Sequence, residues 1–135
     1  MLRLIVAEPG SDAAARHWRA ADQRASSRLL YPEARAALGA ARRADLLDDE
    51  GLAQARRALQ RRCGQLVIIE AGRGVAREAA RLAERHALPV VAAVHLASAL
   101  AAERTLDDVV LVTWDPALAR AARRDGLPTA GAGDG

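Results

Sequence analysis

Two acidic residues stand where a predicted strand gives way to a helix. Asp115 follows the short aliphatic run at residues 109–112 and precedes a proline, which suits the first turn of a helix because its missing N–H costs nothing there. Glu33 follows another proline after a predicted strand at residues 26–31. Ligands of open α/β sheets bind outside the carboxyl ends of the strands. The position of both acids therefore favours a binding or catalytic role for their carboxylates.

Each of these residues also has a purely structural interpretation. Asp115 is placed to cap the helix that follows it, and Glu33 is an acid in a first helical turn, where the helix dipole favours negative charge. His95, in an apolar helix, is typical of a core histidine with satisfied hydrogen bonds, and Thr113 at a strand end needs no function. The residue types alone leave both interpretations open.

The elements that position these residues alternate between strand and helix. The segment at residues 1–7 fits either a strand or a helix end. The predicted strands are 26–31, 66–69, 109–112 and 128–130, and the predicted helices are 11–24, 33–44, one from 48 onward, 75–86, 90–103 and 116–125. Such alternation favours a parallel sheet covered by helices on both faces. We expect one domain over residues 1–130 and a flexible tail over 131–135.

Composition limits the class of protein. The 135 residues suffice for one domain with a real core, which is rich in Ala, Leu and Val and contains no Phe. The formal net charge of +3 permits an acidic partner such as RNA, although plain soluble domains carry as much. The single Cys63 excludes an intrachain disulfide. We expect no membrane association and a cytoplasmic protein, since no apolar run approaches the roughly 20 residues of a membrane span.

All basic residues are arginines, and several are candidates for contact with RNA phosphates or a partner protein. Two of the arginine pairs lie near predicted helix ends, where cations also offset the helix dipole, so an ordinary solvated face explains them equally well. The candidates are Arg35, Arg42, Arg43, Arg56, Arg57, Arg61 and Arg62.

Four segments in order and at matching intervals resemble the PIN-domain family, particularly the VapC-type toxin ribonucleases of bacterial toxin–antitoxin systems. They are IVAEPGS (5–11), SSRLLYPEARAAL (26–38), AVHLASAL (93–100) and LVTWDPALARAARRDGL (111–127). The resemblance covers nearly the whole chain and implies a three-layer α/β/α fold with a parallel sheet. It also implies Mg²⁺- or Mn²⁺-dependent cleavage of RNA, with a cognate antitoxin as partner and a homodimer as the oligomeric state.

The family holds its metal with about four carboxylates, and the resemblance carries two of them to Glu33 and Asp115. Thr113 and His95 match positions that support the metal site. At the third acidic position this sequence has Ala92 instead of Asp, and the first central strand, with its Asp, is missing from the match. Mg²⁺ often binds through one or two carboxylates together with waters and substrate phosphates. We therefore expect Glu33 and Asp115 to bind it weakly and catalysis to be weak or absent.

Three explanations of the missing strand stay open. The strand lies upstream of Met1, or the protein is a degenerate relative, or residues 2–8 replace the strand and bring Glu8 to the position of the lost Asp. The leading alternative function is a catalytically dead PIN-like module that binds a cognate antitoxin or RNA. Loss of the central strand, with nothing in its place, would leave the edges of its two neighbouring strands unpaired. This predicts a poorly stable chain.

Overall fold

The computed structural model describes residues 1–131, and these form two compact units. The first, here called the helical unit, comprises Met1–Arg24 and Leu30–Leu66. The second, the sheet unit, comprises Ala25–Leu29 and the described part of Val67–Gly135. The expected single domain over residues 1–130 stays a prediction. Of the expected tail, Gly131 belongs to a strand, and residues 132–135 lie outside the described residues.

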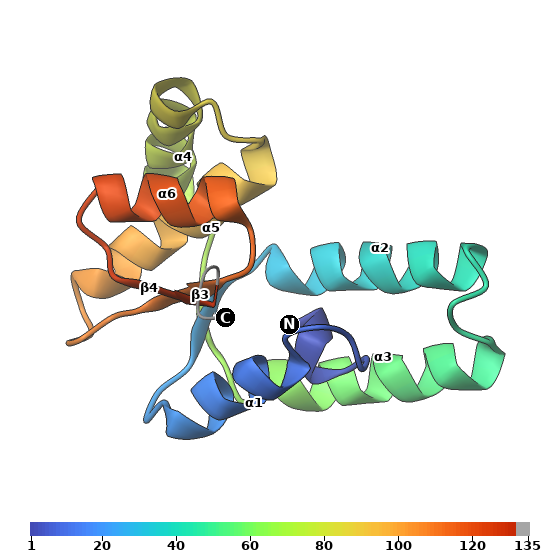
Figure 1. Cartoon of the computed structure of the whole chain (residues 1–135). Helices are drawn as coiled ribbons and strands as arrows, with labels where there is room; N and C mark the ends of the chain where they lie inside the picture. Colours follow the sequence, from blue (N-terminus) through green and yellow to red (C-terminus); the bar gives the residue numbers. More distant parts are fainter. Residues whose placement is uncertain (132–135) are drawn as a thin grey trace. The chain divides into compact units, whose positions relative to one another are not determined.

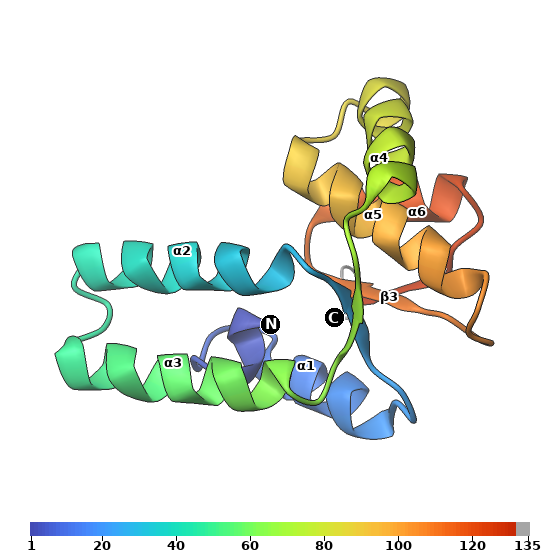
Figure 2. The same cartoon turned by 180° about the vertical axis from the view of Figure 1, so that it is seen from behind.

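The helical unit consists of a short 3-10 helix at Leu2–Leu4, α1 at Ser11–Ala20, and a hairpin of two longer helices. Figures 1 and 2 show the hairpin as two helices side by side, α2 at Leu30–Arg43 and α3 at Asp49–Cys63. The hairpin buries Ala34, Leu38, Ala55 and Leu59. Asp48 caps α3 by accepting a hydrogen bond from the Gly51 N–H at 2.7 Å, as its place at a predicted helix start suggested.

The sheet unit holds all the strands among the described residues. Their order along the chain, with the helices between them, is β1 (Ala25–Ser27), β2 (Val67–Ile69), α4 (Arg73–His86), α5 (Val90–Glu103), β3 (Leu111–Thr113), α6 (Pro116–Arg124) and β4 (Thr129–Gly131). The strands β1 and β2 pair in parallel, and so do β3 and β4. The predicted α/β class with parallel pairing is confirmed.

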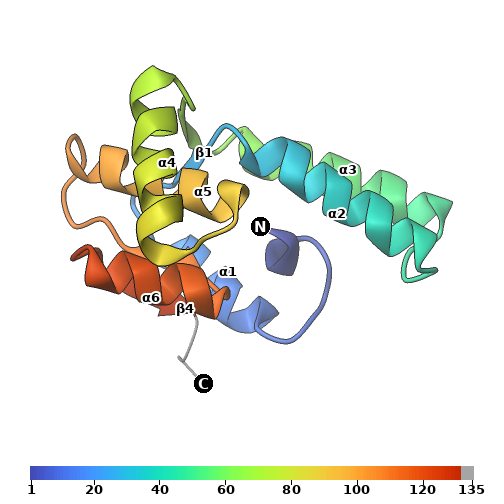
Figure 3. The same cartoon turned by 90° about the horizontal axis from the view of Figure 1, so that it is seen from above.

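The apolar helix α5 forms the centre of the sheet unit. Six of its fourteen residues are buried, and it contacts α4, α6, β1 and β2. Figure 3 shows α4 and α5 crossing within this unit. The core that surrounds α5 includes Leu82 of α4, Leu118 of α6 and Leu127 of the loop after it. A helix that is apolar on nearly all sides is typically buried in this way.

The strands form two separate two-stranded sheets, one from β1 and β2 and the other from β3 and β4. Among the described residues no strand pairs with the second edge of β1 or of β3. Both sheets nevertheless contribute to one hydrophobic core, because Leu29 after β1 and Leu111 in β3 pack against the same buried cluster. The arrangement agrees with a parallel sheet that lacks a central strand.

The prediction was wrong about the extent of the first strand. The strand expected at 26–31 is shorter, because Leu30 and Tyr31 form the start of α2 and Pro32 is the third residue of that helix. Proline is tolerated there since the first N–H groups of a helix have no partner within it. The alternative in which residues 2–8 replace a strand is also contradicted, because Leu2–Leu4 is a 3-10 helix and Glu8 follows no strand.

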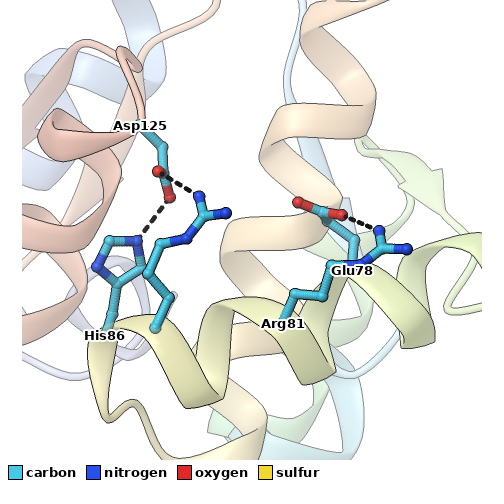
Figure 4. Close-up of polar contacts among 5 residues, drawn as sticks. Glu78, Arg81, His86 and Asp125 are labelled. Carbon is cyan, nitrogen blue, oxygen red and sulfur yellow. Dashed lines mark hydrogen bonds and ion pairs between the residues drawn. The ribbon is translucent and has the colours of Figure 1, made fainter.

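A polar contact joins the ends of α4 and α6 in the sheet unit (Figure 4). The His86 Nε2 lies 2.8 Å from the Asp125 Oδ2, and the second oxygen, Oδ1, accepts a hydrogen bond from Arg85 at 3.2 Å. The side chain of His86 is only 5% exposed and that of Asp125 14%. Because water reaches this pair poorly, loss of either partner leaves a polar atom without compensation.

Within residues 1–131 no single helix is both long and apolar enough to cross a membrane. Only α4 and α5 taken together reach such a length, and they are bent by 118° at the break between them.

We expect His86→Ala to lower the free energy of unfolding by about 1–3 kcal/mol, the usual cost of leaving a buried polar group unpaired. Urea unfolding followed by circular dichroism measures it. Glu78→Ala in α4 is the matched control, since it breaks the exposed Glu78–Arg81 pair drawn in Figure 4 and should cost less. Equal losses in the two variants would contradict the assigned role of His86.

The two short sheets predict uneven protection of the backbone. We expect amides of β1 and β3 to exchange with solvent faster than those of α5, because two-stranded sheets are marginally stable and α5 is buried. Hydrogen exchange followed by NMR provides the measurement. Protection of β1 and β3 as strong as that of α5 would mean that their second edges are paired.

Candidate active site

Asp115 follows β3 by two residues and caps α6. Its Oδ1 accepts hydrogen bonds from the N–H groups of Ala117 at 2.9 Å and Leu118 at 3.3 Å. Asp115 is exposed, and no hydrogen bond or ion pair joins its Oδ2 to the rest of the described chain. Asp115 therefore has the helix-capping role that its position suggested. Its second carboxylate oxygen, Oδ2, remains available to solvent and to a ligand.

Thr113 positions Asp115 through its side chain. The Asp115 N–H donates to the Thr113 Oγ1 at 3.1 Å, which fixes the turn between β3 and α6. Across the sheet Thr113 pairs with Gly131 of β4, whose φ is +101°. A Cβ at Gly131 would lie 2.6 Å from the Thr113 carbonyl oxygen, so only glycine allows β4 to approach here. The supporting role that the resemblance assigns to Thr113 is consistent with this geometry and stays a prediction.

Glu33 lies exposed in the first turn of α2 within the helical unit. The segment that starts at Met1 packs beside this hairpin, where Ile5 and Val6 contact its buried cluster. Burial lowers the pKa of the Met1 amino group, and the negative charge of Glu33 acts in the opposite direction. Glu33 belongs to one unit and Asp115 to the other, so their expected juxtaposition stays a prediction.

His95 and Ala92 both lie on α5 of the sheet unit. His95 is half-buried, and Ala92 packs its methyl group against the core cluster. An aspartate at residue 92 would therefore have its Cβ in contact with the edge of an apolar cluster. The supporting role predicted for His95 is neither contradicted nor tested by these positions.

The residues present suit a hard cation in their chemistry, because Glu33 and Asp115 offer exposed carboxylate oxygens, the ligands that Mg²⁺ and Mn²⁺ prefer. Within residues 1–131 no group of three or more His, Cys, Asp or Glu side chains gathers as a ready metal site. No buried side-chain oxygen or nitrogen in this part of the chain lacks a hydrogen-bond partner either. A metal would therefore depend on a few exposed carboxylates, with water and substrate completing its coordination.

A second charged group at a strand end was missed by the sequence analysis. Arg28 directly follows β1 and Glu70 directly follows β2. The Arg28 Nε donates to the Glu70 Oε2 at 3.1 Å, and a second guanidinium nitrogen donates to Oε1. Glu70 directly follows the strand predicted at 66–69, which was an available signal, but Arg28 lies inside the strand predicted at 26–31 and carried none. Their pairing needed the parallel alignment of segments 42 residues apart.

Three of the seven candidate arginines are engaged within the helical unit. Arg42 pairs with Asp49 and Asp45, Arg35 donates to the Tyr31 hydroxyl, and Arg62 lies over the Trp18 ring at 5.1 Å. The Arg42 hydrogen bond holds the pKa of Asp49 below its usual range. These contacts favour a structural role for the three residues. The others stay candidates for contact with RNA or a partner.

The sheet unit is thus an α/β unit with an exposed carboxylate, that of Asp115, at the carboxyl end of a parallel strand. No family model matches the chain. Comparison with curated proteins finds Ribonuclease VapC45 of Mycobacterium tuberculosis (strain CDC 1551 / Oshkosh) and Ribonuclease VapC49 of M. tuberculosis (strain ATCC 25618 / H37Rv). Each is 39% identical over 129 residues, which cover 96% of this chain and 88% of the relative. The chain belongs to the VapC ribonuclease family.

The two roles of Asp115 can be separated by substitution. We expect Asp115→Ala to lower the free energy of unfolding by roughly 1 kcal/mol through loss of the helix cap, whereas Asp115→Asn should leave it almost unchanged because Asn caps equally well. Urea unfolding of both variants provides the measurement. If Asn destabilised as much as Ala, the cap would depend on the charge rather than on the accepting oxygen.

Proposed function

We propose that this protein is a VapC-type toxin, a metal-dependent endoribonuclease with an incomplete acidic site and weak activity. The observation that carries the proposal is its 39% identity, over 96% of the chain, to two proteins named as ribonucleases of this type. The exposed carboxylate of Asp115 at the end of β3 supports it, because ligands of parallel sheets bind at that edge.

In this proposal Glu33 and Asp115 hold Mg²⁺ or Mn²⁺. The bound metal would supply charge stabilisation at the scissile phosphate and a water of lowered pKa. The chain's own contribution is to hold the Asp115 carboxylate in place, since the α6 cap fixes its Oδ1 and Thr113 fixes its backbone. His95 on the neighbouring helix α5 is proposed as a further supporting residue.

Ala92 is the reason to expect low activity. It stands where the family has a third carboxylate, so the site attracts a divalent cation less strongly, and losing one member of a catalytic group removes most of its rate. A cognate antitoxin is the proposed protein partner, and a homodimer the proposed oligomer.

The same residue favours a second candidate, a catalytically inactive module that binds antitoxin or RNA. The Ala92 methyl group packs into the apolar cluster around α5, as expected of a position that has lost its ligand role. This candidate predicts binding without metal-dependent cleavage.

We expect cleavage of a pool of single-stranded RNA oligonucleotides to require added Mg²⁺ or Mn²⁺ and to fall about 100-fold or more in Asp115→Asn, which removes a ligand charge but keeps the cap. Glu33→Gln should act in the same direction. Gel analysis of the RNA, with and without EDTA, gives the rates.

Asp107→Asn is the control for this assay, because Asp107 is an exposed acid of the sheet unit and the substitution makes the same change of charge. Cleavage that survives EDTA, or that Asp115→Asn leaves intact, would refute the proposed site. No cleavage in any variant together with RNA or antitoxin binding would select the inactive module.

A further inference from the structure

The ion pair between Arg28 and Glu70 lies at the carboxyl ends of β1 and β2, where a parallel sheet presents its ligand-binding edge. The backbone holds the two residues in register without their side chains, since the Arg28 N–H donates to the Ile69 carbonyl at 3.0 Å. The pairing of β1 with β2 therefore does not need this ion pair, and its charges are free to serve another purpose.

The pair is exposed and exchangeable. The side chains of Arg28 and Glu70 are 58% and 66% exposed, and exposed ion pairs are weakly held. The hydrogen bond with Arg28 holds the pKa of Glu70 below its usual range, so the carboxylate is ionised at neutral pH. A guanidinium that binds a carboxylate through two parallel N–H groups presents the same fork to a phosphate. A phosphate can thus replace Glu70 without any rearrangement of Arg28.

We propose that Arg28 contacts a backbone phosphate of the RNA substrate and that Glu70 competes with the phosphate for its guanidinium. This inference rests on the proposed ribonuclease function. A site built on the acids Asp115 and Glu33 repels the RNA backbone, and a cation at a strand end of the sheet offsets part of that repulsion. Glu70 occupies Arg28 while RNA is absent, so the net gain in affinity is smaller than a free arginine would give.

The Glu78–Arg81 pair provides a matched comparison within the same unit. It also joins an exposed arginine to a glutamate through a hydrogen bond of 2.9 Å. Its two residues lie about one turn apart on α4, however, and neither stands at the end of a strand (Figure 4). Substitutions there change the net charge by the same amount as those at Arg28 and Glu70. They test the role of position separately from the role of charge.

The experiment measures binding of a fluorescent pool of single-stranded RNA oligonucleotides in EDTA, by anisotropy, over a range of salt concentrations. We expect Arg28→Gln to weaken binding about three- to tenfold and to reduce the slope of log K against log salt by about 0.7, the value of one phosphate contact on a single strand. Glu70→Gln should tighten binding about two- to fivefold, because it releases Arg28 for the phosphate. Arg81→Gln and Glu78→Gln should show much smaller effects.

The double variant decides whether Glu70 acts through Arg28. In the Arg28→Gln background, Glu70→Gln should bring no gain, and such non-additivity identifies a coupled pair. A gain that persists there, or an Arg28→Gln variant that binds like Arg81→Gln, overturns the inference even if the wild-type protein cleaves RNA. A wild-type protein that neither binds nor cleaves RNA overturns the proposed function and this inference together.

Discussion

Burial of α5 is the interaction on which the sheet unit depends. This helix is apolar along most of its length, and it contacts α4, α6 and the strands β1 and β2. Strands of three residues with a single neighbour form few ladder hydrogen bonds and are marginal alone. The core around α5 supplies the apolar burial that the short sheets lack, and it draws both sheets onto one cluster.

The same brevity of the strands explains where the polar chemistry lies. A strand three residues long buries little of itself, so the residues that directly follow it reach solvent within one or two positions. Arg28, Glu70 and Asp115 all stand at such points. The backbone holds two of them in place: the N–H groups of α6 bind the Asp115 carboxylate, and the Arg28 N–H donates to the Ile69 carbonyl across the β1–β2 pair. Rigid backbone with exposed charge is the arrangement that a binding edge requires.

Much of the fold could be predicted because its signals are local. All six α-helices and the short strands within residues 1–131 were expected, and the helix starts at Asp48 and Asp115 carry the caps that their residue types suggested. The first strand was predicted too long, since the apolar residues Leu30 and Tyr31 suit either a strand or a helix start. The last residue of β1 that pairs with β2 is Ser27, opposite Ile69. No local sequence pattern marks that end of the strand.

By itself the sequence determined the alternation of strands and helices, the buried apolar helix, the caps and the family, because these depend on neighbouring residue types or on the order of motifs. Only the tertiary structure decided that Arg28 meets Glu70 across 42 residues and that His86 meets Asp125 across 39. Such contacts depend on the register of distant segments, which packing of the shared core sets. The residues next to a charged side chain in the sequence do not indicate which distant residue will pair with it in the fold.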